Sequence, residues 1–215
     1  QELKWDEAIA FQTINQYLSM AKQAKGELVI LPETALPISV DTQLQDASQD
    51  QVLSAFNTVA QEQHKAILLG LVAKDKEAYF NSVLGFNSVD NRPQFYHKYH
   101  LVPFGEFIPL KAVFGWVYRD WLNMPLSDLS RGEKYQQPIQ LANQKIAVNI
   151  CYEDVFGEEI IRQLPQATLL VNVSNDAWYG RSNAADQHMQ FSQMRALETG
   201  RTMLLATNTG STTII

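Results

Sequence analysis

Apolar residues near the start of the chain repeat with the period of a helix. The repeat is carried by Phe11, Ile14, Leu18 and Ala21. This spacing predicts an amphipathic helix over residues 6–25, which Gly26 ends. Comparable patterns predict a second helix over residues 48–64 and a third over residues 184–200.

Between these helices the apolar residues form continuous runs instead of alternating with polar ones. The runs are "ELVIL", "KAILLGLVAK", "YFNSVLGFN", "QKIAVNI", "ATLLVNVSN" and "RTMLLATNT". Uninterrupted apolar runs of this length are typical of strands buried on both faces. Because they alternate with helices, the pattern predicts an α/β domain whose sheets are covered by helices.

Composition and charge limit the number of domains and the classes of function that the sequence allows. The chain has 215 residues, 46% of them hydrophobic, which favours a single domain over residues 1–215. Its net charge of −6 argues against a nucleic-acid-binding protein. No apolar run is long enough to cross a bilayer. The single cysteine, Cys151, excludes an internal disulfide.

The two ends of the sequence suggest a fragment. It opens on "QELKWDE" without a Met, and it closes on "NTGSTTII", which reads as the start of a strand. We therefore expect further elements beyond both ends.

Three reactive side chains follow predicted strands. Glu33 comes after "VILP", Cys151 after "AVNI", and Lys98 after the strand-like "QFY". In layered α/β folds, groups at strand ends converge on one crevice. Each also has a plainer interpretation: Cys151 as a packing group, Glu33 as a loop carboxylate capping a helix, and Lys98 as a surface lysine.

Together, a thiol, a carboxylate and an amine can carry out acyl transfer. A nearby ammonium lowers the pKa of a thiol, and a carboxylate within reach can accept its proton. The ammonium can then stabilise an oxyanion. A Cys–His pair is the weaker alternative, because none of the four histidines, His64, His97, His100 and His188, has a distinctive setting in the sequence.

Five motifs in a fixed order give a resemblance to a known family. They are "LPETALP", "HKYHLVPFGEFIP", "NICYEDVFGE", "VNVSNDAWYG" and "QMRALETGRTMLLATNTG". Together they resemble the nitrilase-type carbon–nitrogen hydrolase domain of the bacterial apolipoprotein N-acyltransferase family, over nearly the whole chain.

This resemblance implies a four-layer αββα sandwich, incomplete at both ends because the family's first strand and flanking transmembrane helices are absent. Matched by motif, Glu33 would be the general base, Lys98 the cation beside the oxyanion, and Cys151 the nucleophile. Glu106 matches a second active-site carboxylate. Tyr152 and Glu153, next to the nucleophile, would shape the pocket.

The resemblance also implies the reaction. An acyl chain would pass from a phospholipid, typically phosphatidylethanolamine, through a Cys151 thioester to the N-terminal amine of a diacylglyceryl-cysteine apolipoprotein. It implies neither a metal nor an organic cofactor, and no nucleic-acid partner. The parent would lie in the bacterial inner membrane with this domain on the periplasmic side.

Aromatic residues suggest where lipid could bind. Residues 109–126 are apolar and include Phe114, Trp116 and Trp121, which could form a lid, contact the membrane interface, or fill the core. Trp178 could line an acyl pocket or pack in the core. Asn175 and Asp176 are expected in a rim loop that satisfies its own backbone.

Arg195 and Glu198, three apart on a predicted helix, could form an ion pair.

Two other functions remain open. A soluble amidase could hydrolyse small amides with the same Glu33, Lys98 and Cys151. A catalytically inactive module could instead bind lipid or peptide. Release of ammonia without phospholipid would favour the first, and an unreactive Cys151 beside an open pocket would favour the second.

Overall fold

The computed structural model describes residues 7–90, 92–107, 128–180 and 182–215. Its helices are α1 (Glu7–Gln23), α2 (Gln51–Gln63), α4 (Gly157–Ile160) and α5 (Ala184–Thr199). Short 3-10 turns are η2 (Ala47–Gln49), η3 (Cys151–Val155), η4 (Ile161–Gln163) and η5 (Asp176–Tyr179). None of the helices in these ranges is long and apolar enough to cross a membrane.

The strands form two sheets. The first contains β1 (Leu28–Ile30), β2 (Ser39–Asp41), β3 (Ala66–Asp75), β4 (Ala78–Asn87) and β5 (Gln94–His97). The second contains β6 (Ile139–Leu141), β7 (Gln144–Ile150), β8 (Leu169–Ser174), β9 (Met203–Thr207) and β10 (Thr213–Ile214). The first sheet has the order β1-β3-β4-β5, with β2 also beside β3, and the second has the order β10-β9-β8-β7-β6.

Strand directions bring several strand ends to one side. In the first sheet β1 runs parallel to β3, and both β3–β4 and β4–β5 are antiparallel, so β5 runs in the direction of β1. In the second sheet β7, β8 and β9 are parallel neighbours. Segments that follow β1 and β5 can therefore meet segments that follow β7 and β8.

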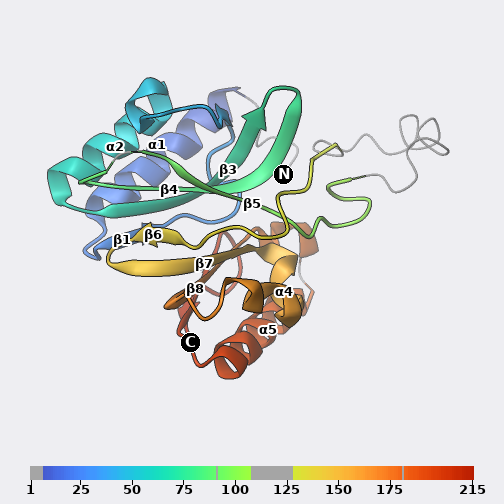
Figure 1. The fold of residues 1–215 in the computed structure, drawn as a ribbon. Coiled ribbons are helices and arrows are strands. Elements are labelled where there is room, and N and C mark those ends of the chain that lie inside the picture. The colour runs from blue at the N-terminus through green and yellow to red at the C-terminus, as the bar shows by residue number, and fades with distance from the viewer. Residues whose placement is uncertain (1–6, 91, 108–127, 181) are drawn as a thin grey trace, which may run out of the picture.

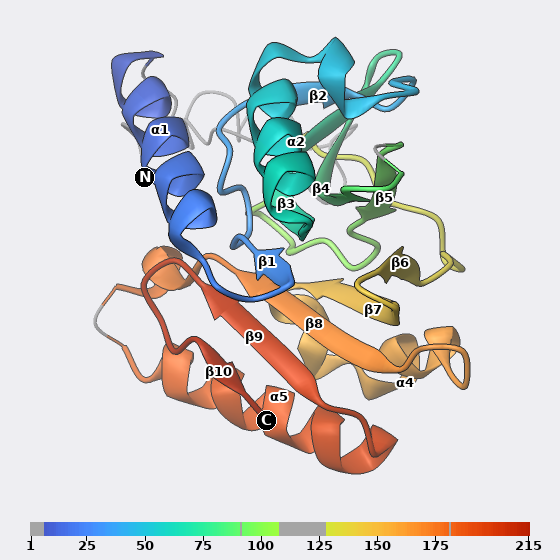
Figure 2. The same ribbon diagram turned by 90° about the vertical axis from the view of Figure 1, so that its left-hand side faces the viewer.

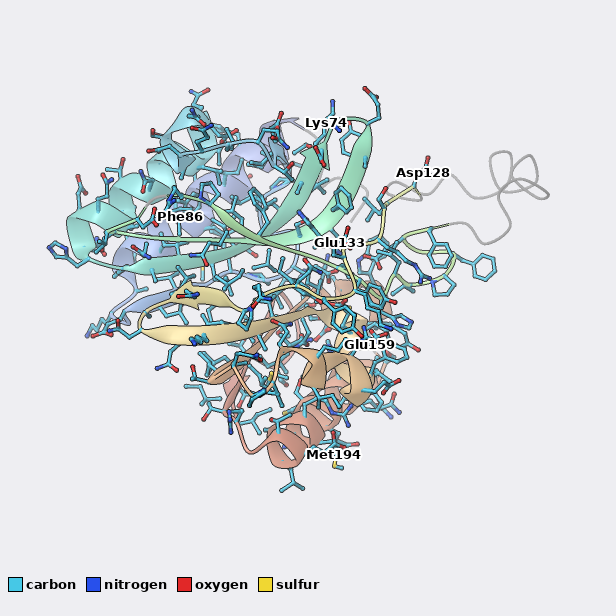
Figure 3. The ribbon with its side chains drawn as sticks, in the orientation of Figure 1. Lys74, Phe86, Asp128, Glu133, Glu159 and Met194 are labelled. Carbon is cyan, nitrogen blue, oxygen red and sulfur yellow. The ribbon has the colours of Figure 1, made fainter. Side chains whose placement is uncertain are left out.

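Three separate cores show that the molecule has four layers. The side chains of β3 alternate between two of them: Ile67 and Leu69 face the helix side, whereas Ala66 and Leu68 face the second sheet. Phe86 of β4, labelled in Figure 3, belongs to the helix-side core. The sheets are thus buried on both faces, as the apolar runs predict.

The second sheet alternates in the same way. Ile146 and Val148 of β7 face the first sheet, while Ala147 faces α4 and α5. Figures 1 and 2 show the resulting order of layers, with α1 and α2 above the first sheet and α5 below the second. The predicted αββα sandwich is confirmed.

Local signals account for the helix boundaries. Asp50 caps α2 by accepting hydrogen bonds from the backbone N–H groups of Val52 and Leu53. The predicted helix over residues 48–64 is therefore divided, because Asp50 is extended and separates η2 from α2. Gly200 ends α5 with a φ of 61°.

Candidate active site

Glu33, Lys98 and Cys151 lie close together, as their strand-end positions predict. Glu33 follows β1, Lys98 follows β5, and Cys151 follows β7 directly. All three are buried, with exposures of 6%, 1% and 5%. The interpretation of Lys98 as a surface lysine is therefore wrong.

The Glu33 carboxylate is held from both sides. Its Oε1 accepts a hydrogen bond from Asn81 Nδ2 at 2.7 Å, and its Oε2 accepts one from the backbone N–H of Asn175 at 2.9 Å. Asn175 is the N-cap residue of η5, so Glu33 contacts the start of that turn as well as the other side chains of the site. The loop reaches this position because Gly70 of β3 has no Cβ, which would otherwise lie 2.4 Å from the carbonyl oxygen of Pro32.

Lys98 bridges two carboxylates. Its Nζ lies 2.9 Å from Glu106 Oε2 and 3.6 Å from Glu33 Oε1. Asn81 Nδ2 also donates to both carboxylates, at 2.7 Å in each case. Glu106 is fixed further by the backbone N–H of Val102, which donates to Oε2 at 2.9 Å. The structure therefore places Glu106 beside the lysine.

Lys98 is a permanent cation. Burial alone would lower the pKa of its ammonium, but the charges of Glu33 and then Glu106 outweigh burial and raise this pKa well above its ordinary value. The amine therefore remains charged at physiological pH and can act as a hydrogen-bond donor.

Cys151 occupies a strained turn between β7 and η3. Its φ is 53°, a left-handed conformation that costs free energy in a residue with a side chain. Thr34, which follows Glu33, has a φ of 44°. Such strained residues cluster at functional sites because surrounding contacts hold them in place.

The Cys151 thiol is not a preformed thiolate. Burial raises its pKa, and the neighbouring Glu33 carboxylate raises it further; Lys98 and the nearby Ser174 hydroxyl oppose this, leaving a pKa of about 12. The expectation that the ammonium would lower this pKa is correct in direction but is outweighed. Attack therefore needs a base to take the proton as the bond forms.

Glu153 accepts four hydrogen bonds from residues around the site. Its Oε1 accepts from the backbone N–H groups of Tyr99 and His100 at 2.7 and 3.0 Å. Its Oε2 accepts from the Ile150 N–H at 2.8 Å and the Tyr96 hydroxyl at 3.0 Å. Burial raises the pKa of Glu153 to about 7. This carboxylate ties the segment carrying the lysine to the strand that ends at the nucleophile.

Tyr152 lies at the surface of the same turn. It is 37% exposed and packs edge-on against His100 and Phe156, with ring centroids 5.9 and 5.1 Å apart. Glu159, at the start of the next helix, is labelled in Figure 3 on this side of the molecule.

A cavity of about 180 Å³ opens beside the nucleophile turn. It is lined by aromatic, small and polar side chains: Tyr152, Asp154, Val155, Tyr179, Ala184, Gln187, His188 and Phe191. Burial, followed by the neighbouring Cys151, raises the pKa of the Tyr179 hydroxyl. The cavity therefore lies next to the turn that carries the nucleophile, with Tyr152 and Tyr179 in its wall.

The structure tests the interpretation of Trp178 but not that of Trp116. Trp178 is 56% exposed, so its interpretation as a core residue is wrong. Trp116, with the rest of residues 109–126, lies outside the described residues.

The predicted rim loop is more buried than expected. Asn175 is 1% and Asp176 5% exposed, and both take part in contacts with other segments. Arg195 and Glu198 do form an ion pair, at 2.9 Å.

Sequence reasoning missed several polar residues. Asn81 lies within β4, and Ser174 ends β8, where its hydroxyl lies within hydrogen-bond reach of the thiol. His188 lies on α5 between two buried aspartates. The signal that could have revealed it is a series of polar residues at helical spacing, His188, Ser192 and Arg195, all of which are buried.

The described residues contain no group of three or more His, Cys, Asp or Glu side chains suited to holding a metal ion.

Comparison with known protein families gives a match over the whole chain. The carbon–nitrogen hydrolase model matches residues 1–215.

Curated relatives are similar over the whole chain. An apolipoprotein N-acyltransferase from Nitrosomonas europaea is 50% identical over 217 residues, which cover 100% of this chain and 42% of that protein. One from Chromobacterium violaceum is 44% identical, covering 100% of this chain and 40% of that protein. The chain thus spans about two-fifths of the length of these relatives.

Solved structures share the fold. A carbon–nitrogen hydrolase from Helicobacter pylori G27 superposes with a TM-score of 0.66 at 18% identity, covering 94% of this chain and 69% of that one. The Caenorhabditis elegans NitFhit protein gives a TM-score of 0.68 at 22% identity, covering 97% and 50%.

Proposed function

The chain belongs to the carbon–nitrogen hydrolase family, and on this premise we propose that residues 1–215 form one catalytic domain of an N-acyltransferase. It moves an acyl chain from a phospholipid, through a thioester on Cys151, to the N-terminal amine of a diacylglyceryl-cysteine apolipoprotein. The observation that carries this proposal is the full-length similarity to proteins named apolipoprotein N-acyltransferase, combined with a buried carboxylate, ammonium and thiol in one site.

In the first half-reaction Cys151 Sγ attacks the ester carbonyl of the phospholipid. Because the thiol has a pKa of about 12, Glu33 takes its proton as the S–C bond forms. The tetrahedral intermediate collapses with cleavage of the C–O bond. Glu33 returns the proton to the leaving alkoxide, which gives a lysophospholipid and an acyl-enzyme.

Lys98 stabilises the oxyanion in both half-reactions. Its ammonium is held by Glu106 and stays charged, so it can donate toward developing negative charge. The backbone N–H of Tyr152 is the natural second donor, since it lies in the first turn of η3, where N–H groups have no acceptor within the helix.

In the second half-reaction the neutral amine of the apolipoprotein attacks the thioester. An N–C bond forms, Glu33 accepts the amine proton, and the C–S bond breaks. The proton then passes from Glu33 to the departing thiolate, which regenerates both groups. The amide product is more stable than the thioester, so this step runs downhill.

The relatives named apolipoprotein N-acyltransferase are longer than this chain, which covers 42% of the Nitrosomonas protein. From the similarity to these relatives we propose that the domain is part of a longer inner-membrane enzyme and faces the periplasm. Its partners would be phosphatidylethanolamine and the apolipoprotein acceptor. The exposed Trp178 and Tyr179 beside the site are suited to contact lipid.

The test is to measure the intact mass of the complete protein in detergent, with and without phosphatidylethanolamine. We expect a mass gain of one acyl chain that neutral hydroxylamine removes. Cys151→Ala should abolish the gain, whereas Glu158→Gln, a change at an exposed carboxylate, should leave it intact.

A different result would favour hydrolysis. Absence of an acyl adduct, combined with release of ammonia from small amides, would overturn the transferase proposal in favour of an amidase with the same three side chains. An unreactive Cys151 would favour a binding module.

A further inference from the structure

A second buried cation lies beneath the nucleophile. His188, on α5, is 7% exposed, and its two ring nitrogens face different carboxylates. Nε2 lies 3.1 Å from Asp154 Oδ2, and Nδ1 lies 3.1 Å from Asp176 Oδ1. An ionised carboxylate only accepts hydrogen bonds, so both nitrogens must carry a proton. The geometry therefore describes an imidazolium between two aspartates.

The same imidazolium contacts the backbone of the nucleophile. His188 Nε2 is 3.0 Å from the carbonyl oxygen of Cys151. Asn172 Nδ2 donates to this oxygen from the other side, also at 3.0 Å. These contacts fix the peptide group that follows the strained φ of 53° at Cys151.

Further residues on the buried face of α5 also contact η3, the turn that begins at Cys151. Ser192 Oγ donates to Asp154 Oδ2 at 2.8 Å. Arg195 Nη1 donates to the carbonyl oxygens of Asp154 and Val155 at 3.2 and 3.1 Å. The helix therefore binds η3 through polar contacts, where an ordinary amphipathic helix would use apolar packing.

Ser174 connects the histidine cluster to the sulfur. Its hydroxyl donates to Asp176 Oδ1 at 2.8 Å and also lies within hydrogen-bond reach of Cys151. A hydroxyl has only one proton to donate. Because His188 Nδ1 also donates to Asp176 Oδ1, the Ser174 proton can turn to the thiolate without leaving that carboxylate unpaired.

We propose that His188 is a positioning residue that remains protonated throughout the reaction, holding Cys151 in its left-handed conformation and freeing Ser174 to donate to the thiolate. This inference rests on the proposed function only in taking Cys151 as the nucleophile. His188 takes no proton from the substrate, since its nitrogens face the carboxylates and a backbone oxygen.

The surrounding charges support this role. Burial would lower the pKa of His188, but the hydrogen bonds that its ring donates to Asp154 and then to Asp176 raise this pKa to about 10. The backbone at Gly210 lies against the Asp176 carboxylate, because a side chain at this position would collide with it. Ser192 and Arg195 on the same helix and Ser174 on β8 complete the polar surroundings.

The test is the rate at which iodoacetamide alkylates Cys151 in the complete protein, measured from pH 6 to 10. The variants are His188→Gln, Asp176→Asn, their combination, and Ser174→Ala. His64→Asn serves as the control, because His64 is exposed and ends α2, in the helix layer that covers the first sheet. Thermal unfolding establishes the folded fraction, to which each rate is normalised.

The electrostatic role predicts changes of opposite sign. His188→Gln removes the cation and should slow alkylation about tenfold, corresponding to one unit in the thiol pKa. Asp176→Asn removes an anion and should accelerate it. The double variant should lie between them, and Ser174→Ala should slow it severalfold with little change in the unfolding temperature.

If His188 served only to stabilise the fold, the alkylation rates of the variants would follow a different pattern. If folded His188→Gln alkylates at the wild-type rate, or if Asp176→Asn slows the reaction as well, the inference is overturned. Should His188→Gln not fold, Asp176→Asn and Ser174→Ala still decide the question.

The two proposals fail separately in these experiments. Alkylation needs no lipid, so a missing acyl adduct with the expected series would overturn only the proposed function. A normal acyl adduct with a flat alkylation series would overturn only the inference about His188.

Discussion

Two buried cations flank the nucleophile, one from each half of the sandwich. Lys98, after β5 of the first sheet, lies between Glu33 and Glu106. His188, on the helix that covers the second sheet, lies between Asp154 and Asp176. The two clusters have the same charge pattern, an anion on either side of a cation.

They differ in the part of the nucleophile that each cation reaches. The charge of Lys98 interacts with the Cys151 sulfur, whereas His188 donates to the Cys151 carbonyl oxygen. The first cluster is thereby suited to proton transfer and oxyanion stabilisation. The second is suited to holding the backbone. Similar charge patterns serve different purposes because they contact different atoms of one residue.

The largest expected effect separates the clusters by chemistry. Glu33→Gln should slow acyl-enzyme formation on the order of 10³-fold, because the amide cannot accept the thiol proton. The matched change in the other cluster, Asp176→Asn, should leave this rate within about tenfold. Rapid-quench mass spectrometry of the acyl adduct measures both. An equal decrease in the rate of acyl-enzyme formation for the two variants would contradict the proposed division of roles.

The next effect concerns stability. Lys98→Met should lower the free energy of unfolding by about 3–5 kcal/mol, since it leaves two buried carboxylates without their cation. Adding Glu106→Gln should recover part of the loss. Urea denaturation provides the measurement, with Lys145→Met as the control at an exposed lysine. A loss no greater than that of the control would show that Lys98 is not needed to compensate these carboxylates.

The second cluster predicts a pH dependence of stability. The pKa of His188 is raised from 6.5 to about 10, so the folded state holds a proton that the unfolded state releases. Its contribution is complete below pH 6.5 and is lost as the pH rises toward 10, at about 1.4 kcal/mol per pH unit.

Unfolding of wild type and His188→Gln across this range isolates the contribution. The difference between the two proteins should shrink as the pH rises, while His64→Asn should follow wild type. A difference that is constant with pH would contradict a protonated His188.

The smallest effect lies outside both clusters. Trp178→Ala should change the free energy of unfolding by no more than about 0.5 kcal/mol, because the side chain is 56% exposed. Phe56→Ala, at a fully buried position, should cost about 3–5 kcal/mol. Calorimetry on both variants makes the comparison. A large loss at Trp178 would restore its interpretation as a core residue.

Much of the fold follows from apolar patterns in the sequence. The runs that became β3, β4, β7 and β8 are largely apolar because both faces of each sheet are covered. The sequence patterns did not predict two strands, β2 (Ser39–Asp41) and β6 (Ile139–Leu141). Three residues are too short for a periodicity to show, and these strands depend on pairing with β3 and β7.

The sequence by itself determined that Glu33, Lys98 and Cys151 end buried strands, because strand ends are marked by a change from apolar to polar residues. Only the tertiary structure decided which atoms meet: that Asn81 joins Glu33 to Glu106, and that His188 reaches the backbone of Cys151. Such contacts join residues as far apart as 142 positions, as between Glu33 and Asn175, so no local pattern contains them. The raised pKa of the thiol has the same origin, since burial and neighbouring charge are properties of the packed molecule.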